Sequence, residues 1–274
     1  MQNKRRNTGT ALIYLLLSFG GVLMLFPFVW MILTSFKTGA DIYSFSFIPR
    51  PFTTANYEKV FRTTDFPLWF ANSLGIGIVT TASVLFFDAL TGYVLCKMDF
   101  PGKNVIFVII LSTMMIPTEM LIIPWYNMCS NFGWLNSYWS IMFPGIITAF
   151  GIFMMRQFFG GVPTDLLEAA RIDGISELGL FFRVAIPLVL PAISALAIFT
   201  FLGNWNAYLW PVIIVSKYSL YTLPVGLATF SSDAGSEWGL IMAGATMATV
   251  PVLIVFLFFQ RQIIEGINLT GMKS

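Results

Sequence analysis

Long apolar segments separated by short polar connections constrain this chain more than any other feature. A helix that crosses a bilayer needs about 20 predominantly apolar residues. Six segments meet this requirement, and they cover about residues 11–36, 68–96, 105–125, 138–159, 186–215 and 239–260. Only 10% of the residues are charged, whereas soluble domains carry about 25%. The sequence therefore predicts an all-α integral membrane protein with six transmembrane helices.

The first apolar segment follows a basic stretch, Lys4-Arg5-Arg6, as the core of a signal peptide would. The apolar run is too long for such a core, and no Ala-x-Ala cleavage pattern follows it. We therefore expect a retained first span, in which Pro27 introduces a kink. The connection over residues 37–67 is the longest polar one, and we expect it to be irregular or partly helical.

The distribution of Lys and Arg predicts the orientation, because cytoplasmic connections close to the spans are enriched in these residues. One side of the bilayer receives Lys4, Arg5, Arg6, Lys97, Lys103, Arg156, Arg171, Arg183, Arg261 and Lys273. The other side receives Lys37, Arg50, Lys59, Arg62 and Lys217. The first set is larger and lies in shorter connections. We therefore place it in the cytoplasm, together with both termini and the connection over residues 160–186. The first external connection, with four basic residues, departs from the rule.

The longest polar island inside the apolar part of the chain runs from Glu168 to Pro191. Its residues predict a short helix–turn–helix at the membrane surface. Thr164 is expected to cap the first helix, with Asp165 at its positive end. Gly174 is a natural helix stop, and Ser176 is expected to cap the second helix, with Glu177 in its first turn.

The composition of this island suggests a surface that fits into another protein. Ala169 and Ala170 leave a low profile, and Glu168 and Asp173 place fixed charges at its edge. Two prolines, Pro187 and Pro191, mark the start of the next apolar segment, where a missing N–H costs least. A solvated loop helix between two spans, with no partner, accounts for the same residues equally well.

Two acidic residues lie within the predicted spans, where a charge costs about 2.5–3.5 kcal/mol at mid-span. Asp88 lies in the second span, and a polar partner at a subunit interface or in a cavity explains it; the alternative is a side chain that reaches the interface. Glu119 lies in the third span, where Pro117 and Pro124 predict a broken helix, as transport pathways often contain. The alternative for Glu119 is a carboxylate on the external surface.

Several kinds of chemistry are not supported by the sequence. It contains no histidine, and its two cysteines, Cys96 and Cys129, fall on opposite sides of the predicted bilayer. We therefore expect no metal site, no disulfide and no Cys/His catalysis. Gly102-Lys103-Asn104 does not complete a phosphate-binding loop. We expect no cofactor in this chain, and no ATP hydrolysis by the chain itself.

Several motifs along the chain together resemble the permeases of bacterial ABC importers. They are Glu168-Ala169-Ala170, Asp173-Gly174, Phe181-Phe182-Arg183, Ile186-Pro187, Pro191, Asn72-Ser73-Leu74, Phe100-Pro101-Gly102-Lys103, the stretch from Trp205 to Pro211, and the tail from Arg261 to Lys273. The first of these motifs names the EAA loop of that family, which we place at residues 160–186. The resemblance is closest to the carbohydrate-uptake subfamily, the second permease subunit of maltose-type importers. Leu190 and Asp88 depart from the family pattern.

This resemblance implies a type I importer permease fold, with one permease domain over residues 1–274 and core helices over about residues 68–262. It implies that the EAA loop holds a cytoplasmic coupling helix that docks on an ATPase, through Glu168, Ala169, Ala170, Asp173, Gly174, Pro187 and Pro191. The implied partners are a second permease subunit, two ATPase subunits that bind ATP and Mg, and an extracytoplasmic substrate-binding protein. The implied location is the bacterial cell membrane.

The fifth predicted span carries a cluster with the chemistry that sugars require: Asn204, Trp205, Asn206, Tyr208 and Trp210. Aromatic faces stack on the C–H surfaces of sugars, and amides bond to hydroxyl groups. In a continuous helix, Asn204 would share one face with Tyr208, and Asn206 would share another with Trp210. We take these five residues, with Glu119 and Asp88, as the candidate substrate pathway. The alternative is an aromatic belt with interhelical amide bonds.

Two other functions remain as rivals at this stage. An ion-coupled secondary transporter would use Asp88 and Glu119 and would need no ATPase. A membrane enzyme would need a nucleophile with a base or a metal constellation, which the sequence does not offer. The leading hypothesis is the non-catalytic transmembrane subunit of an ATP-driven importer for sugars or sugar derivatives.

Overall fold

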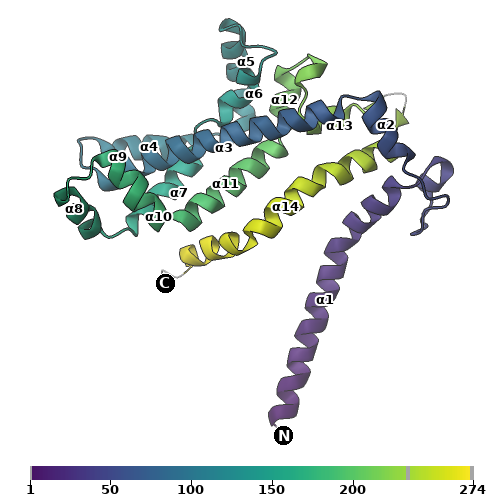
Figure 1. Ribbon diagram of the computed structural model, residues 1–274, viewed down its shortest axis with the longest axis horizontal. Coiled ribbons are helices and arrows are strands. Elements are labelled where there is room, and N and C mark those ends of the chain that lie inside the picture. The colour runs from purple at the N-terminus through teal and green to yellow at the C-terminus, as the bar shows by residue number, and fades with distance from the viewer. Residues whose placement is uncertain (1, 233–234, 272–274) are drawn as a thin grey trace. The chain divides into compact units, whose positions relative to one another are not determined.

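The computed structural model describes residues 2–232 and 235–271, and the side chains of residues 2–9, 11–12, 232, 235–236 and 259 onward lie outside the description. In the described residues, helices make up the regular structure apart from one antiparallel pair of two-residue strands, β1 (Ser231–Ser232) and β2 (Gly235–Ser236). The predicted all-α class is therefore confirmed (Figure 1). The tail motif ends at Met272 and Lys273, which lie outside the described residues.

The backbone forms two compact units. The first holds the chain up to Pro67 together with Gly226–Pro251, and the second holds Leu68–Val225 with the chain from Val252 onward. The single permease domain stays a prediction from the sequence. Each unit is described by itself.

The first unit contains helix α1 (Gln2–Ser35), the 3₁₀ turn η1 (Gly39–Tyr43), helix α2 (Ala55–Thr63) and the first part of helix α14 (Trp238–Gly271). The connection after α1 is thus partly helical, as expected. Its basic residues are held by the chain itself. The buried Lys37 ammonium donates to the carbonyls of Ser44 and Ser46 at 3.2 and 2.5 Å and lies 4.7 Å from the centre of the Trp30 ring.

Lys59 in the same connection forms an ion pair with Glu237. Two of the four basic residues that depart from the orientation rule therefore have intramolecular partners. A lysine committed to carbonyl groups or to a carboxylate offers less free charge to the membrane surface, so these residues weigh less against the predicted orientation.

Among the residues that the structure describes, three helices are long and apolar enough to cross a bilayer on their own: α1 over Ile13–Ser35, α3 (Phe66–Lys97), and α14 over Trp238–Phe258. Three other predicted spans are helix pairs with a sharp bend. If each pair makes one crossing, the number reaches the predicted six, which stays a prediction. The bent spans are the part of the chain that builds the cavity described below.

The third predicted span consists of α4 (Lys103–Thr113), followed by η2 (Thr118–Leu121) and α5 (Ile122–Asn131), with a bend of 93° at the break. The broken helix expected from Pro117 and Pro124 is therefore confirmed at Pro117, whereas Pro124 lies within the first turn of α5. In the fourth, α6 (Tyr138–Met142) and η3 (Phe143–Gly145) meet α7 (Ala149–Gly160) at 43°.

The fifth predicted span differs from the expected continuous helix over residues 186–215. A helical stretch formed by α9 (Glu177–Leu180), the π-helical turn η4 (Phe181–Ala185) and α10 (Ile186–Leu188) bends by 85° into α11 (Leu190–Trp205). Helix α11 has 16 residues, or about 24 Å at 1.5 Å per residue. A separate helix, α12 (Leu209–Ile214), follows it.

The break after α11 has a local cause in Pro211. A continuous helix would need an N–H at this position to bond to the carbonyl of Ala207, and proline has none. The expected pairs Asn204–Tyr208 and Asn206–Trp210 therefore do not share helix faces, and that expectation is wrong.

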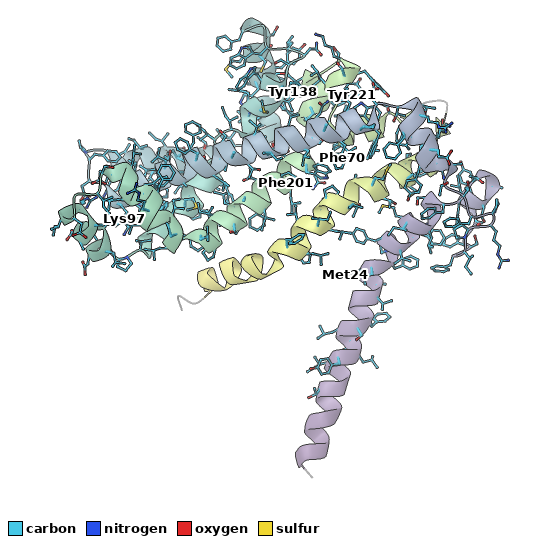
Figure 2. All side chains as sticks on the ribbon, in the orientation of Figure 1. Met24, Phe70, Lys97, Tyr138, Phe201 and Tyr221 are labelled. Carbon is cyan, nitrogen blue, oxygen red and sulfur yellow. The ribbon has the colours of Figure 1, made fainter. Side chains whose placement is uncertain are left out.

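The second unit places the EAA loop at one end and the helices α6 and α12 toward the other. Figure 1 shows α8 (Thr164–Ile172), α9 and α10 at the C-terminal end of α3, and α6 and α12 toward its N-terminal end. Figure 2 shows Lys97 beside the first group and Tyr138 and Tyr221 beside the second. The unit also contains η5 (Tyr218–Leu220) and the first half of α13 (Leu223–Ala228).

An aromatic core lies beneath the EAA loop. The buried ring of Tyr93 on α3 lies 5.4 Å from both Phe159 of α7 and Phe181 of η4, measured between ring centres. Leu167 and Ala170 of α8 are part of the same core cluster. The EAA loop is therefore packed onto α3 and α7 and does not extend freely from them.

Candidate functional site

The first helix of the EAA loop begins one residue earlier than the predicted cap. Pro163 occupies the N-cap position with φ −60° and ψ 128°, and Thr164 is already the first helical residue. The prediction that Thr164 caps the helix is therefore wrong, because the residue in the flanking conformation is a proline with no side-chain acceptor. Asp165 lies in the first turn, where a carboxylate is favoured by the helix dipole.

The end of α8 matches the prediction. Gly174 has φ +82°, in the left-handed region. Its N–H donates to the Arg171 carbonyl at 3.0 Å, and the Ile175 N–H donates to the Ala170 carbonyl at 3.1 Å. This pair of bonds is the Schellman arrangement, which satisfies the last carbonyls of a helix. The turn therefore directs the chain into the second short helix.

The second helix starts as predicted, since the Ser176 hydroxyl accepts from the Gly179 N–H at 3.3 Å and Glu177 lies in the first turn. An ion pair that the sequence analysis missed joins the two helices. Arg171 donates from Nε and Nη2 to the two carboxylate oxygens of Glu177 at 2.6 and 3.1 Å. These hydrogen bonds lower the pKa of Glu177 and raise that of Arg171.

The exposed surface of the EAA loop is more apolar than the sequence suggested. Ala169 is exposed, but Ala170 is buried in the core beneath the loop, so the expectation that both alanines form the outer surface is half wrong. Position 170 lies on the inward face of α8 with Leu167, three residues earlier. Instead, large apolar side chains are exposed on the loop, led by Ile172 at 88% and joined by Leu166 and Leu178.

Charged residues surround these apolar side chains. Glu168 and Asp173 are both exposed, as the sequence predicted for the edge of the loop. An exposed apolar surface with charges around it is typical of a protein interaction site. The loop therefore has the surface chemistry of a docking element.

Pro187 and Pro191 lie at the bend that follows the second short helix. Pro187 lies near the end of the helical stretch Glu177–Leu188, directly after the π-helical turn, and Pro191 lies at the start of α11, on the other side of the 85° bend. Proline is tolerated at the start of α11 because the first N–H groups of a helix have no partner within it. The two prolines therefore shape the turn that connects the EAA loop to α11.

A cavity of about 610 Å³ lies at the breaks of the third and fourth spans and at the break after α11, in the second unit. Its size is within the usual range for small-molecule sites, about 300–1,000 Å³. The wall is apolar with a few hydroxyl and amide groups and two indole rings. Those polar and aromatic residues are Thr113, Thr118, Thr148, Asn204, Thr222, Trp125 and Trp210.

Two of the predicted pathway residues line this cavity. The Trp210 indole donates from Nε1 to the Ser140 carbonyl at 2.8 Å, and its ring centre is 5.8 Å from that of Trp125. The Asn204 amide donates to the Thr200 carbonyl at 2.8 Å, which fixes its orientation. The sequence analysis did not select Trp125 or the threonines, which come from other spans and meet Asn204 only in the folded chain.

The other predicted pathway residues of this region lie elsewhere. Trp205 is 2% exposed, and its ring packs against Phe70 and Phe201 at 5.3 and 5.9 Å between centres. Asn206 and Tyr208 are exposed and do not line the cavity. Glu119 is exposed on η2, next to the lining residue Thr118.

Asp88 is fully enclosed, with an exposed fraction of 0%. Its two carboxylate oxygens accept from the Thr148 N–H, both at 3.1 Å, and one of them accepts from the Thr148 hydroxyl at 2.6 Å. No Lys or Arg among the described side chains forms an ion pair with it. The alternative of a side chain that reaches the membrane interface is therefore wrong. The polar partner of Asp88 is Thr148 of the same chain, which lies at the break in the fourth span.

Comparison with known proteins identifies the family. Residues 89–268 match the model described as the binding-protein-dependent transport system inner membrane component. The chain belongs to this family. It is 36% identical over 258 residues to the arabinooligosaccharides transport system permease protein AraQ of Bacillus subtilis (strain 168), with 92% of each chain covered. It is 34% identical to the lactose transport system permease protein LacG of Rhizobium radiobacter, with 97% of each chain covered.

The fold also matches a solved structure. A crystal structure of a bacterial ABC transporter involved in the import of the acidic polysaccharide alginate superposes with a TM-score of 0.84. The match has 24% identity and covers 93% of this chain and 96% of that one. Together these findings show an ABC importer permease, a membrane protein that works with a substrate-binding protein and is not itself a catalyst. The rival hypotheses of an ion-coupled transporter and a membrane enzyme are set aside.

Proposed function

We propose that this ABC importer permease imports a sugar or sugar derivative, and that the EAA loop couples its movement to ATP hydrolysis. The transporter would contain a second permease subunit, two ATPase subunits that bind ATP and Mg, and an extracytoplasmic substrate-binding protein. Both termini and the EAA loop would face the cytoplasm of the bacterial cell.

The exposed surface of α8 and α9 is the observation that carries the coupling role. Ile172, Leu166 and Leu178 are exposed on a loop that is otherwise packed firmly onto α3 and α7. The Schellman turn and the Arg171–Glu177 pair hold the two short helices in one shape. A docking element that must transmit a push needs both properties, an apolar contact surface and a rigid base.

The substrate class is supported by the relatives and by the cavity. The names of relatives refer to arabinooligosaccharides, lactose, diacetylchitobiose and trehalose/maltose, and one refers to sn-glycerol-3-phosphate. The cavity combines indole rings with amide and hydroxyl groups, which is the combination that a sugar requires. Asn204 and Trp210 are the pathway residues that line it.

The coupling role is tested with two variants of the EAA loop, Glu168→Lys and Gly174→Asp. Each is expected to insert normally but to lower sugar uptake far more than the ATPase activity of the assembled transporter. The matched control is Gly160→Ala, at the last residue of α7 and outside α8 and α9, where an added Cβ meets no atom within 4 Å. Normal uptake and normal recovery of the ATPase subunits with both variants would reject the coupling role.

The substrate class is tested by uptake into vesicles that contain the whole transporter, with labelled arabinotriose, lactose, maltose and glycerol 3-phosphate offered in turn. We expect ATP-dependent uptake of at least one sugar. We also expect Asn204→Ala to reduce uptake at limiting sugar without loss of assembly, whereas Trp205→Ala reduces the amount of assembled permease, because Trp205 is a packing residue. Equal effects of Asn204→Ala and Trp205→Ala on uptake and on the amount of assembled permease would contradict the assignment of the cavity as the sugar site.

A further inference from the structure

Helix α7 connects the two sites described above. Its N-terminal end, with Thr148 and Ala149, lines the cavity, and its C-terminal end leads through residues 161–163 directly into α8 of the EAA loop. Along the chain, a movement of the EAA loop reaches the cavity through α7 on the N-terminal side of the loop and through α11, which ends next to Asn204, on the C-terminal side. What holds α7 therefore matters for transport.

Helix α3 bonds to both ends of α7. At the cavity end, Asp88 accepts from the N–H and hydroxyl of Thr148, which is the N-cap of α7. At the other end, the Lys97 ammonium donates to the Val162 carbonyl at 2.6 Å. Asp88 and Lys97 come from the same helix, so α3 bonds to α7 at its start and just beyond its end.

The charges suit these positions. A helix carries partial positive charge at its N-terminus and partial negative charge at its C-terminus, so a carboxylate is stabilised at the first and an ammonium at the second. This pairing gives Asp88 a favourable setting within the membrane-spanning part of the chain, where an uncompensated charge is costly. It also defines the position of α7 along α3, because an axial shift of either helix would separate both charges from their partners.

The backbones of the two helices come close together between these bonds. A Cβ added at Gly92 of α3 would lie 2.8 Å from the backbone nitrogen of Arg156. A Cβ added at Gly151 of α7 would overlap Oδ2 of Asp88. A further contact, from the Ser83 hydroxyl to the Ile146 carbonyl at 2.7 Å, holds the break before α7. Helices α3 and α7 are thus joined along their shared length.

We propose that Asp88 and Lys97 fasten the two ends of α7 to α3, so that these helices move as one strut between the EAA loop and the cavity. This inference rests on the proposed function. Asp88 does not touch substrate, since it is enclosed and does not line the cavity. It is a positioning residue that acts through Thr148, and Lys97 has the same role at the opposite end.

The experiment follows nucleotide-dependent opening of the cavity in the assembled transporter, in lipid vesicles, with N-ethylmaleimide as the probe. Cys96 and Cys129 are first replaced by serine, and Ala207→Cys places one thiol in the cavity lining. The labelling rate is measured without nucleotide and after trapping with ADP and vanadate. The ratio of the two labelling rates reports how much closure of the ATPase subunits changes the accessibility of the thiol in the cavity. The measurement can be made without knowing which sugar is transported.

With Asp88 and Lys97 present, the two rates are expected to differ. With Asp88→Asn or Lys97→Met, the ratio is expected to fall toward one while the transporter still assembles and hydrolyses ATP. Thr148→Val is expected to lower the ratio in part, because it removes the hydroxyl that donates to Asp88 and accepts from the Gly151 N–H but keeps the backbone N–H donor. Thr148→Ser keeps the hydroxyl and is expected to preserve the ratio. If Asp88→Asn does not assemble, the comparison of Thr148→Val with Thr148→Ser decides.

Gly151→Ala adds an independent test. The single variant displaces the Asp88 carboxylate and is expected to lower the ratio, whereas Gly151→Ala in an Asp88→Ala background is expected to have no further effect. Thr80→Val and Gly160→Ala are the controls. Thr80 is also enclosed on α3 but bonds within its own helix, and Gly160 has open space around it.

A role in stability alone would reduce the amount of assembled transporter and leave the ratio per transporter unchanged. An unchanged ratio in Asp88→Asn and Lys97→Met would therefore overturn the strut. A ratio of one in the transporter that retains both residues would instead contradict the proposed ATP-driven function, and the strut with it. The two failures are distinguishable because the first is seen in the variants Asp88→Asn and Lys97→Met, and the second in the transporter that retains Asp88 and Lys97.

Discussion

Single residues decide the shape of the EAA loop. Gly174 turns the chain because it adopts φ +82°, a region that costs other L-residues about 1–2 kcal/mol, with Asn tolerated better than most. The Arg171–Glu177 pair then joins the two short helices across this turn. Both features are local, so their energetic consequences are testable one residue at a time.

We expect Gly174→Ala to destabilise the permease by about 1–2 kcal/mol, and Gly174→Asn to cost less. The reason is backbone strain, since an added Cβ meets no atom within 4 Å at this position. Thermal unfolding of the purified variants measures the difference. Equal melting temperatures for Gly174→Ala and the unaltered chain would contradict the left-handed turn.

We expect Glu177→Gln to lower the unfolding free energy by about 0.2–1 kcal/mol at neutral pH, the usual range for an exposed ion pair. Because Arg171 lowers the pKa of Glu177, the contribution is fully present above the ordinary Glu pKa of about 4.3. It is lost as the pH falls through the lowered pKa of the folded chain. The melting temperatures of Glu177→Gln and of the unaltered chain should therefore converge as the pH falls through this range. A difference between the two that stays constant at all pH values would refute the ion pair.

The packing of α3 against α7 is the element-scale feature on which the site depends. The two helices approach closely enough at Gly92 that a Cβ there would contact backbone and Cβ atoms of α7 at 2.8 and 2.9 Å. Backbone atoms cannot give way as a flexible side chain does. The close approach therefore depends on the absence of a side chain at this position.

We expect Gly92→Ala to destabilise the permease by about 1–3 kcal/mol, the usual cost of overpacking. Gly75→Ala is the matched control on the same helix, because an added Cβ there has open space and alanine favours a helix by up to about 1 kcal/mol over glycine. Chemical or thermal denaturation compares the two. Similar effects at both positions would contradict the close contact.

At the scale of the whole molecule, the predicted orientation assigns the EAA loop and the connection before α13 to opposite sides of the membrane. Ile172 is 88% exposed, and Lys217 is also exposed. In a chain with Cys96 and Cys129 replaced by serine, we expect Lys217→Cys to react with a membrane-impermeant maleimide in spheroplasts. Ile172→Cys should react only after the membrane is opened. The reverse pattern would overturn the orientation.

The sequence by itself determined the features that depend on composition and on local backbone chemistry. Apolar runs predicted the membrane helices, Pro117 predicted the broken third span, and Gly174 and Ser176 predicted the turn and cap in the EAA loop. Such features can be predicted from the sequence because each depends only on residues that are close together along the chain. Thr164 was wrongly assigned as a cap for the same local reason, since the preceding proline takes the flanking position.

Only the tertiary structure decided which distant residues meet. Asp88 has its donors at Thr148, 60 residues later, and nothing in the spacing of the two residues connects them. The cavity joins Asn204 and Trp210 to side chains of other spans, while Trp205 between them is turned into the packing. The hydropathy of a residue is the same on either face of a helix and therefore does not predict which way its side chain points. That direction is set by packing against the neighbouring helices.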